Sequence, residues 1–297
     1  MRKIGTCAER FELPLGDAGY PALLAESPDP PSRLYGLGDP SLLVPGLAVI
    51  GARKATPYGL QAAQLFAGWA ARAGYTIVSG GAIGCDQAAH RAALEAGSAT
   101  VAVLGCGADV VYPSNAAELL VEIARTGVVV SEQPWGTPPQ RWTFRTRNRI
   151  IAGLAGALLV LESGLPSGTF STADYALAAG RDVLVVPGSI FAPECRGANR
   201  LLHQGATPIC DVSELSDALV GVLPPPTTSP EAWTLGANAT NDDPVLAALR
   251  THHWRPDDLA RTLTLDIVTV ARRIGALEGA GLVVRFPDGR YGGTPRH

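Results

Sequence analysis

The chain has 297 residues, of which 46% are hydrophobic and 17% charged, a balance that can bury a sizeable core and excludes a disordered or low-complexity protein. The formal net charge is -3, so any binding of nucleic acid must come from a local patch of charge. The sequence shows neither a leader pattern nor an apolar run of the roughly 20 residues that a membrane helix needs. We expect a cytoplasmic protein without membrane contact. The five cysteines form no C-x-x-C pair, and we expect neither a metal site nor a cofactor.

Residues 1–45 are expected to form an N-terminal extension that packs on the domain that follows. From residue 46 to 223 one unit recurs, in which a short apolar run is followed by a glycine-rich turn and an alanine-rich helical stretch. Such runs, continuously apolar and separated by helices, are typical of strands in a parallel sheet that is covered on both faces. The sequence therefore predicts an α/β domain with a doubly wound, mostly parallel sheet. The predicted strands are 47–50, 76–78, 100–104, 128–130, 157–161, 183–186 and 207–210.

In a doubly wound sheet, ligands bind in the crevice beyond the carboxyl ends of the strands. The segments that follow the predicted strands are rich in glycine and small residues, which leave backbone N–H groups free to bind phosphate. The simpler interpretation is that each glycine only makes a tight turn. Several such turns at one edge favour a binding site, whose candidate residues are Gly51, Ala52, Arg53, Lys54, Gly80, Gly81, Ser167, Gly168 and Thr169.

The segment 141–149 contains four arginines and two aromatic residues, with no acidic residue. In a helix, Arg141, Arg145, Asn148 and Arg149 share one face by their i, i+3 and i+4 spacing, with Phe144 beside them. Guanidinium groups bind phosphates, and a neighbouring ring can stack on a base, as in single-stranded nucleic acid binding. A solvated helix with internal ion pairs is the alternative, although no acid lies nearby in sequence. The candidates here are Arg141, Phe144, Arg145, Arg147, Asn148 and Arg149.

Two carboxylates, Glu132 and Glu162, also follow predicted strands. A catalytic role is conceivable for a lone carboxylate at that edge, but we expect both to pair with the arginines and orient them. The sequence contains no G-x-x-x-x-G-K-[ST] motif, so an ATPase of the P-loop class is not supported.

Proline-rich residues 224–240 are predicted to form a linker. The tail, 241–297, contains three stretches of helical spacing, the third with Asp266 as its expected N-cap, and then a hairpin with a turn at Asp288-Gly289. Three helices followed by a hairpin are the plan of a winged-helix domain. The tail has eight arginines and seven acids, so it predicts at most a weak contact with duplex DNA.

Several of these motifs together resemble the DNA-processing protein DprA (Smf) family. The resemblance runs over about residues 21–211, in the segments 51–53, 77–86, 144–154, 167–169 and 199–206. It implies an extended Rossmann-like fold that binds single-stranded DNA and forms a homodimer, without needing a nucleotide cofactor. It also implies a recombination mediator that protects incoming DNA and loads the RecA recombinase in natural transformation. Because no Ser/His/Asp or Cys/His arrangement can be assembled from the sequence, we expect no enzymatic activity.

Carried over to this sequence, the resemblance makes Arg53 the arginine of the turn after the first strand and Phe144 the base-stacking aromatic. Arg141 matches a basic position just ahead of that aromatic. Arg181 matches a further basic position, although it precedes its strand and is therefore expected to lie away from the crevice.

Two other functions remain open from the sequence. A nucleotide phosphoribohydrolase of the lysine-decarboxylase-like type shares the architecture, but its P-G-G-x-G-T-x-x-E motif carries a catalytic glutamate. Here Gly168-Thr169 is followed by Phe170, Ser171 and Thr172, so a threonine stands at the position of that glutamate. A regulator that binds double-stranded DNA through the winged helix is the second alternative.

Overall fold

The computed structural model describes residues 2–5, 8–223, 244–263, 265–279, 282–286 and 289–293. The chain divides into two compact units, Met1–Thr228 and Ser229–His297. The predicted linker at 224–240 lies outside the described residues. None of the helices within the described ranges combines the length and apolar character that crossing a bilayer requires.

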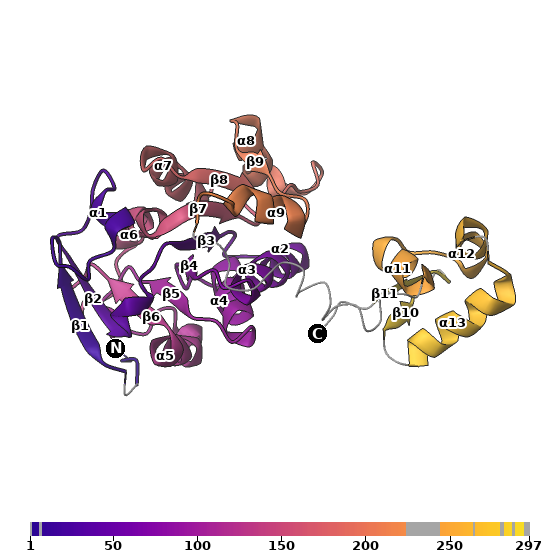
Figure 1. The fold of residues 1–297 in the computed structure, drawn as a ribbon, viewed down its shortest axis with the longest axis horizontal. Coiled ribbons are helices and arrows are strands. Elements are labelled where there is room, and N and C mark those ends of the chain that lie inside the picture. The colour runs from indigo at the N-terminus through magenta and orange to yellow at the C-terminus, as the bar shows by residue number, and fades with distance from the viewer. Residues whose placement is uncertain are drawn as a thin grey trace. The chain divides into compact units, whose positions relative to one another are not determined.

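The larger unit is built on a nine-stranded sheet in the order β1-β2-β6-β5-β4-β3-β7-β8-β9 (Figure 1). The strands from β3 to β9 run parallel to one another, as the sequence predicted. In the central register, Ala48 of β3 lies opposite Val78 of β4 and Leu158 of β7. The parallel strands are β3 (Gly46–Ile50), β4 (Ile77–Ser79), β5 (Thr100–Val103), β6 (Val128–Ser131), β7 (Ala155–Val160), β8 (Asp182–Val185) and β9 (Thr207–Pro208).

The N-terminal extension is part of this sheet, which corrects the prediction that it only packs on it. Strands β1 (Arg10–Pro14) and β2 (Arg33–Gly38) pair antiparallel with each other, and β2 pairs antiparallel with β6. Both strands contain glycine or proline, which weaken the sequence signal of a strand. They cover the edge of β6, where unpaired backbone groups would otherwise be exposed.

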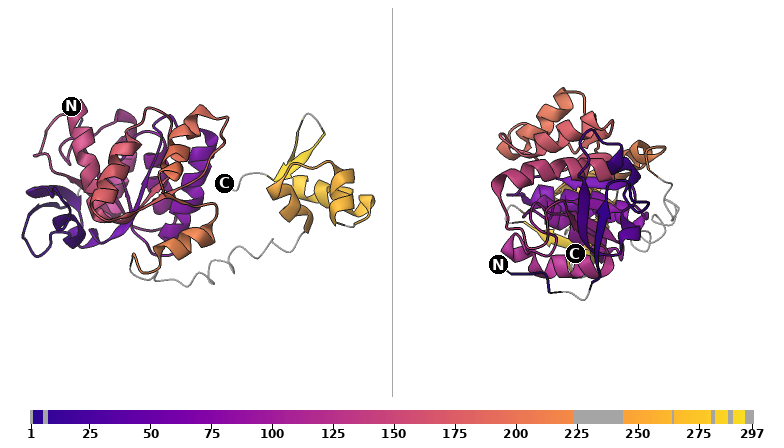
Figure 2. Two further views of the ribbon diagram at one scale, coloured as in Figure 1. Left: turned by 90° about the horizontal axis from the view of Figure 1, so that it is seen from above. Right: turned by 90° about the vertical axis from the view of Figure 1, so that its left-hand side faces the viewer.

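Helices cover both faces of the sheet (Figures 1 and 2). One face carries α2 (Pro57–Ala62), which continues through a π-helical turn into α3 (Gly68–Arg72), and then α4 (Cys85–Glu95) and α5 (Ala117–Thr126). The other carries α6 (Arg141–Leu154) and α7 (Thr169–Ala178), with the short α1 (Ala22–Ala25) beside α6. Near β8 and β9 lie α8 (Arg196–His203) and α9 (Val212–Leu219). Because both faces are covered, every residue of β3 is buried.

The strand order reverses beside β3. The chain winds outward from β3 through β4 and β5 to β6, and α6 then returns it to β7 on the other side of β3. Helix α6 reaches β7 without a connecting loop, since Leu154 ends the helix and Ala155 begins the strand. The turns after β3 and β7 thus flank the crevice that a doubly wound sheet leaves at such a reversal.

The smaller unit has its own apolar core. Its elements are α11 (Pro244–Thr251), α12 (Pro256–Leu263), α13 (Ile267–Gly279), β10 (Val283–Arg285) and β11 (Tyr291–Gly293). The side chain of Asp266 accepts a hydrogen bond of 2.9 Å from the Thr269 N–H, which makes it the predicted cap of α13. The order of elements is the predicted one, while Asp288 of the expected turn lies outside the described residues. The winged-helix assignment stays a prediction.

Candidate nucleic-acid interface

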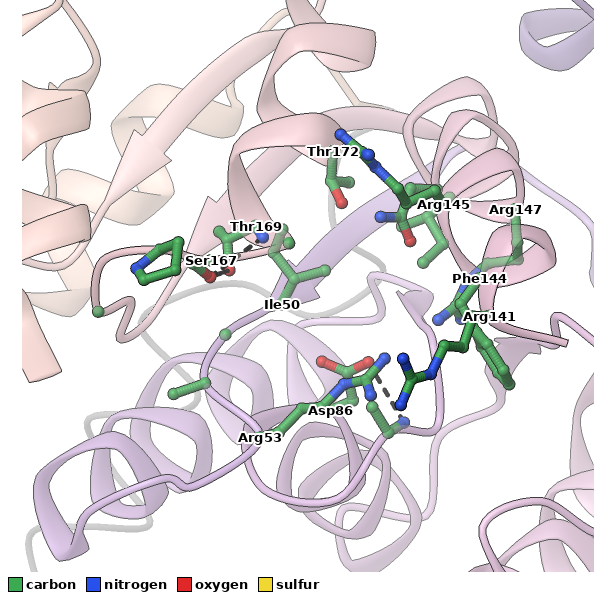
Figure 3. Close-up of a pocket in the computed structure, with 18 residues that line it drawn as sticks. Ile50, Arg53, Asp86, Arg141, Phe144, Arg145, Arg147, Ser167, Thr169 and Thr172 are labelled. Carbon is green, nitrogen blue, oxygen red and sulfur yellow. Dashed lines mark hydrogen bonds between the residues drawn. The ribbon is translucent and has the colours of Figure 1, made fainter. Parts of the chain in front are cut away.

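A pocket of about 360 Å³ opens at the crevice between β3 and β7 (Figure 3), and we call it the arginine pocket. Its walls come from the turn after β3, the start of α4, the first half of α6 and the segment that leads into α7. The structure thus brings together residues that are more than a hundred positions apart. The predicted residues that line it are Gly51, Ala52, Arg53, Arg141, Phe144, Arg145, Arg147, Asn148, Ser167, Gly168 and Thr169.

Three exposed guanidinium groups, those of Arg53, Arg141 and Arg145, line this pocket. None of the three forms a hydrogen bond or an ion pair with another residue in the part of the chain that the structure describes. Figure 3 shows Arg53 and Arg141 reaching into the pocket from opposite sides. The first turn of α6 contains no acidic residue, so the positive end of the helix dipole adds to their potential. The arrangement can bind an anion.

A second, more apolar hollow of about 290 Å³ adjoins the pocket, and we call it the apolar slot. Arg53, Phe144 and Arg147 line both. The half-buried Phe144 ring has its centroid 5.0 Å from that of Tyr112 and 5.9 Å from the Arg53 guanidinium carbon. The predicted site residues Lys54 and Gly80 belong to this slot. A ring between a basic and an apolar hollow is suited to stack on a nucleobase whose phosphate is bound nearby.

The prediction that Arg147 grips phosphate with its neighbours is wrong. Its side chain is buried, with only 4% of the residue exposed, and it donates a hydrogen bond to the Val103 carbonyl. Burial lowers the pKa of Arg147 to about 10. The guanidinium lies directly against Gly80, where any Cβ would collide with it. Arg147 therefore supports the floor of the site.

Asp86, which we did not predict as a site residue, lies beside Arg147 at the back of the pocket. Burial raises the pKa of the Asp86 carboxyl, while the Arg147 guanidinium acts in the opposite direction. Its Oδ2 accepts a hydrogen bond of 3.3 Å from the Ala82 N–H, in the turn after β4. The position of Asp86 at the start of α4, behind a glycine-rich turn, was the sequence signal that could have identified it.

Arg149 of α6 pairs with two carboxylates, of which the sequence predicted only that of Glu132. Its Nη2 lies 2.7 Å from a carboxylate oxygen of Glu132, and its Nε lies 2.8 Å from one of Asp29. Arg149 does not line the pocket, and its ion pair with Asp29 joins α6 to the N-terminal extension. Asp29 is distant in sequence, so a search of nearby residues does not reveal it, whereas the predicted pairing of Glu132 with an arginine is confirmed.

Three further predictions are resolved by position. Glu162 pairs with no arginine among the described residues: its carboxylate accepts hydrogen bonds from the N–H and the hydroxyl of Thr56, at 2.9 and 2.8 Å, ahead of α2. Arg181 lies outside the pocket, as its place in sequence indicated, and donates to the Leu23 carbonyl. Gly81 lines neither hollow and has a φ of +66°, which explains a glycine in this turn.

One buried histidine outside the site makes the stability of the fold sensitive to acid. His90 of α4 is fully buried, with Nδ1 2.8 Å from the Thr100 hydroxyl oxygen. Burial lowers the pKa of His90 from 6.5 to about 3, and the Arg147 guanidinium adds to the effect. The unfolded chain then binds more protons than the folded chain between these values, so stability falls as pH drops below 6.5.

We expect the parent protein to lose about 2 kcal/mol more of its free energy of unfolding than His90→Gln between pH 7.5 and pH 5. Glutamine retains a group that can hydrogen-bond Thr100 but does not titrate. Urea unfolding of both proteins at the two pH values measures the difference. Equal losses in the two proteins would show that folding does not lower the pKa of His90.

Comparisons with known proteins identify the family of this chain. The profile of the family described as DNA recombination-mediator protein A matches residues 13–220. The chain is 36% identical over 209 residues to the DNA processing protein DprA of Bacillus subtilis, covering 70% of each chain. It is 40% identical over 213 residues to Protein Smf of Synechocystis, covering 70% of this chain and 53% of that protein. The chain thus spans about half the length of the Synechocystis relative.

Two solved structures share the fold of the larger unit. The crystal structure of DprA from Streptococcus pneumoniae has a TM-score of 0.67 and 35% identity, with 71% of this chain and 74% of that chain covered. DNA processing protein A from Helicobacter pylori, described in terms of its single-stranded DNA binding mode, has a TM-score of 0.66 and 31% identity, with 73% and 98% covered. The resemblance of the motifs is confirmed, and the chain belongs to the family of the DNA recombination-mediator protein A.

Proposed function

We propose that this chain binds single-stranded DNA in the arginine pocket and the apolar slot, and that it thereby acts as a recombination mediator. The observation that carries the proposal is the set of three exposed guanidinium groups, Arg53, Arg141 and Arg145, which line the arginine pocket together with the Phe144 ring and form no salt bridge with a described residue. The guanidinium groups bind phosphates and the ring stacks on a base. The Helicobacter pylori relative is described as a single-stranded DNA binder.

The cellular role that we propose is to protect incoming DNA and to load the RecA recombinase on it during natural transformation. We propose further that the protein acts as a homodimer in the cytoplasm, without catalysis, and that the C-terminal unit makes at most a weak duplex contact. Thr172 lines the pocket at the position where the phosphoribohydrolase motif carries its glutamate, which favours binding over that reaction. Light scattering tests the dimer, and RecA assembly on DNA with and without this protein tests the loading.

The affinity for single-stranded DNA should depend on salt. Each phosphate neutralised on a single strand contributes about -0.7 to the slope of log affinity against log salt. If three arginines each bind one phosphate, the slope is about -2 for the parent and loses about 0.7 in magnitude in Arg141→Ala. Fluorescence anisotropy of a labelled oligonucleotide at several salt concentrations gives these slopes.

Arg125→Ala provides the matched control, because Arg125 is an exposed arginine on α5, on the other face of the sheet (Figure 1). It should leave the slope of the parent unchanged. A slope near zero for the parent would refute phosphate binding in the arginine pocket. Tighter binding to duplex than to single-stranded DNA would instead favour the winged-helix regulator.

A further inference from the structure

A second groove, of about 440 Å³, continues from the arginine pocket between α6 and α7. The two hollows share Arg145 and the segment 166–168. The groove has three lining residues of its own, Phe170, Ser171 and Asp174. Neither the sequence motifs nor the proposed phosphate site uses these three. The groove is therefore an unassigned surface that is continuous with the proposed DNA site.

The walls of this groove are held in place by contacts between the two helices. The Asn148 side-chain amide donates a hydrogen bond of 3.0 Å to the Ser171 hydroxyl, which in turn donates one of 2.8 Å to the Gly168 carbonyl. Phe170 and Asp174 are four residues apart on α7 and therefore share one face. The Phe170 ring is half-buried and packs against the main core. The groove is therefore lined by an aromatic ring, that of Phe170, which packing holds in place.

The charges along the groove differ from one end to the other. Arg145 is exposed at the end that joins the arginine pocket. Figure 3 shows its side chain extending from α6 toward α7. Asp174 is exposed on α7, and its carboxylate forms no hydrogen bond or ion pair with any residue in the described ranges. A carboxylate only accepts hydrogen bonds and repels phosphate, so the part of the ligand beside Asp174 must carry donors.

We propose that this groove binds the nucleotide next to the one in the arginine pocket and favours guanine. This inference rests on the proposed function and extends it to base selection. Arg145 binds the phosphate between the two nucleotides, and the Phe170 ring contacts the second base. The Asp174 carboxylate accepts hydrogen bonds from guanine, whose N1–H and N2–H groups lie side by side on an edge that is free in a single strand. Thymine presents a single N–H there.

The test compares three oligonucleotides that differ in one base. An oligothymidylate of about ten nucleotides is the reference, a length within the range of one single-strand site. The second has one central guanine, and the third has hypoxanthine, which lacks the N2 amino group. We expect the parent to bind the guanine oligonucleotide about fivefold more tightly than the reference, with hypoxanthine between them.

Asp174→Asn should reduce the guanine-to-thymine ratio of affinities to about one, because an amide cannot accept both hydrogen bonds. The ratio is the readout, since removal of a negative charge alone strengthens binding to every oligonucleotide alike. Asp217→Asn on α9 is the control: Asp217 is also exposed and lines neither hollow nor this groove. It removes the same charge and should keep the fivefold ratio of the parent.

Two results would overturn the guanine site while leaving the proposed function intact. They are equal binding of the three oligonucleotides by the parent, and an unchanged guanine preference in Asp174→Asn. If the parent binds none of the oligonucleotides, the proposed function itself fails, and this site fails with it.

Discussion

Replacing Arg147 with methionine should lower the free energy of unfolding by about 3–5 kcal/mol, the cost of removing one partner from a buried pair of charges. The substitution leaves the buried Asp86 without the guanidinium that offsets its desolvation, and it leaves the Val103 carbonyl without its donor. Protonation of Asp86 limits the loss, because burial already raises the pKa of its carboxyl. Urea denaturation at neutral pH, followed by far-ultraviolet circular dichroism, measures the change.

Arg141→Met is the matched control for Arg147→Met. Arg141 lies on the same helix, is exposed and makes no ion pair with a described residue, so its loss should change stability by less than about 0.5 kcal/mol. The two substitutions should thus have opposite profiles, with Arg147 affecting stability and Arg141 affecting DNA binding. A fully stable Arg147→Met protein with reduced affinity for DNA would restore Arg147 to the phosphate-binding set.

The second large effect concerns binding. Phe144→Ala should weaken the binding of single-stranded DNA by about 1–3 kcal/mol, the range for one lost stack between a base and an aromatic ring. Arg53→Ala should cost about 1.5–3 kcal/mol through the loss of a charge-assisted hydrogen bond. Arg53→Lys should recover only part, because an ammonium cannot bind a phosphate as a bidentate fork.

The losses of affinity caused by Phe144→Ala and Arg53→Ala should not be additive. The Arg53 guanidinium carbon lies 5.9 Å from the Phe144 ring centroid, so we expect both residues to contact the same nucleotide. The double variant should therefore lose less affinity than the sum of the single losses. Anisotropy titrations, with the melting temperature of each variant as a check on folding, complete the cycle. A lower melting temperature for Arg53→Ala with unchanged affinity would assign Arg53 to the fold.

The sequence predicted the parallel part of the sheet because β3 to β8 are short apolar runs separated by helices. The rule that ligands bind beyond the carboxyl ends of such strands then led to Arg53 and Ser167 at one crevice, and the structure brings them together. The edge strands β1 and β2 were missed, because an antiparallel strand at an edge needs neither a continuous apolar run nor a helix beside it.

The roles of the α6 arginines could not be predicted from their spacing. Arg145, Arg147 and Arg149 lie within five residues, yet the first is exposed in the pocket, the second is buried and the third is paired. Their environments depend on residues that are distant in sequence, Asp86 for Arg147 and Asp29 for Arg149. A helical wheel shows which side chains share a face, but it does not show what the opposite surface contains.

Helix α6 continues into β7 without a loop. We expect this connection to affect how the loss of conformational entropy on binding is divided between the protein and a DNA strand. The helix that carries Arg141, Phe144 and Arg145 is anchored at its C-terminal end by a fully buried central strand, so we expect the helix to move little when a ligand binds. The protein then contributes a frame whose backbone is ordered before the encounter, and the flexible strand of DNA bears most of the ordering entropy. Affinity should consequently rise for strands whose backbone is already extended, and association should proceed without a slow rearrangement of this helix.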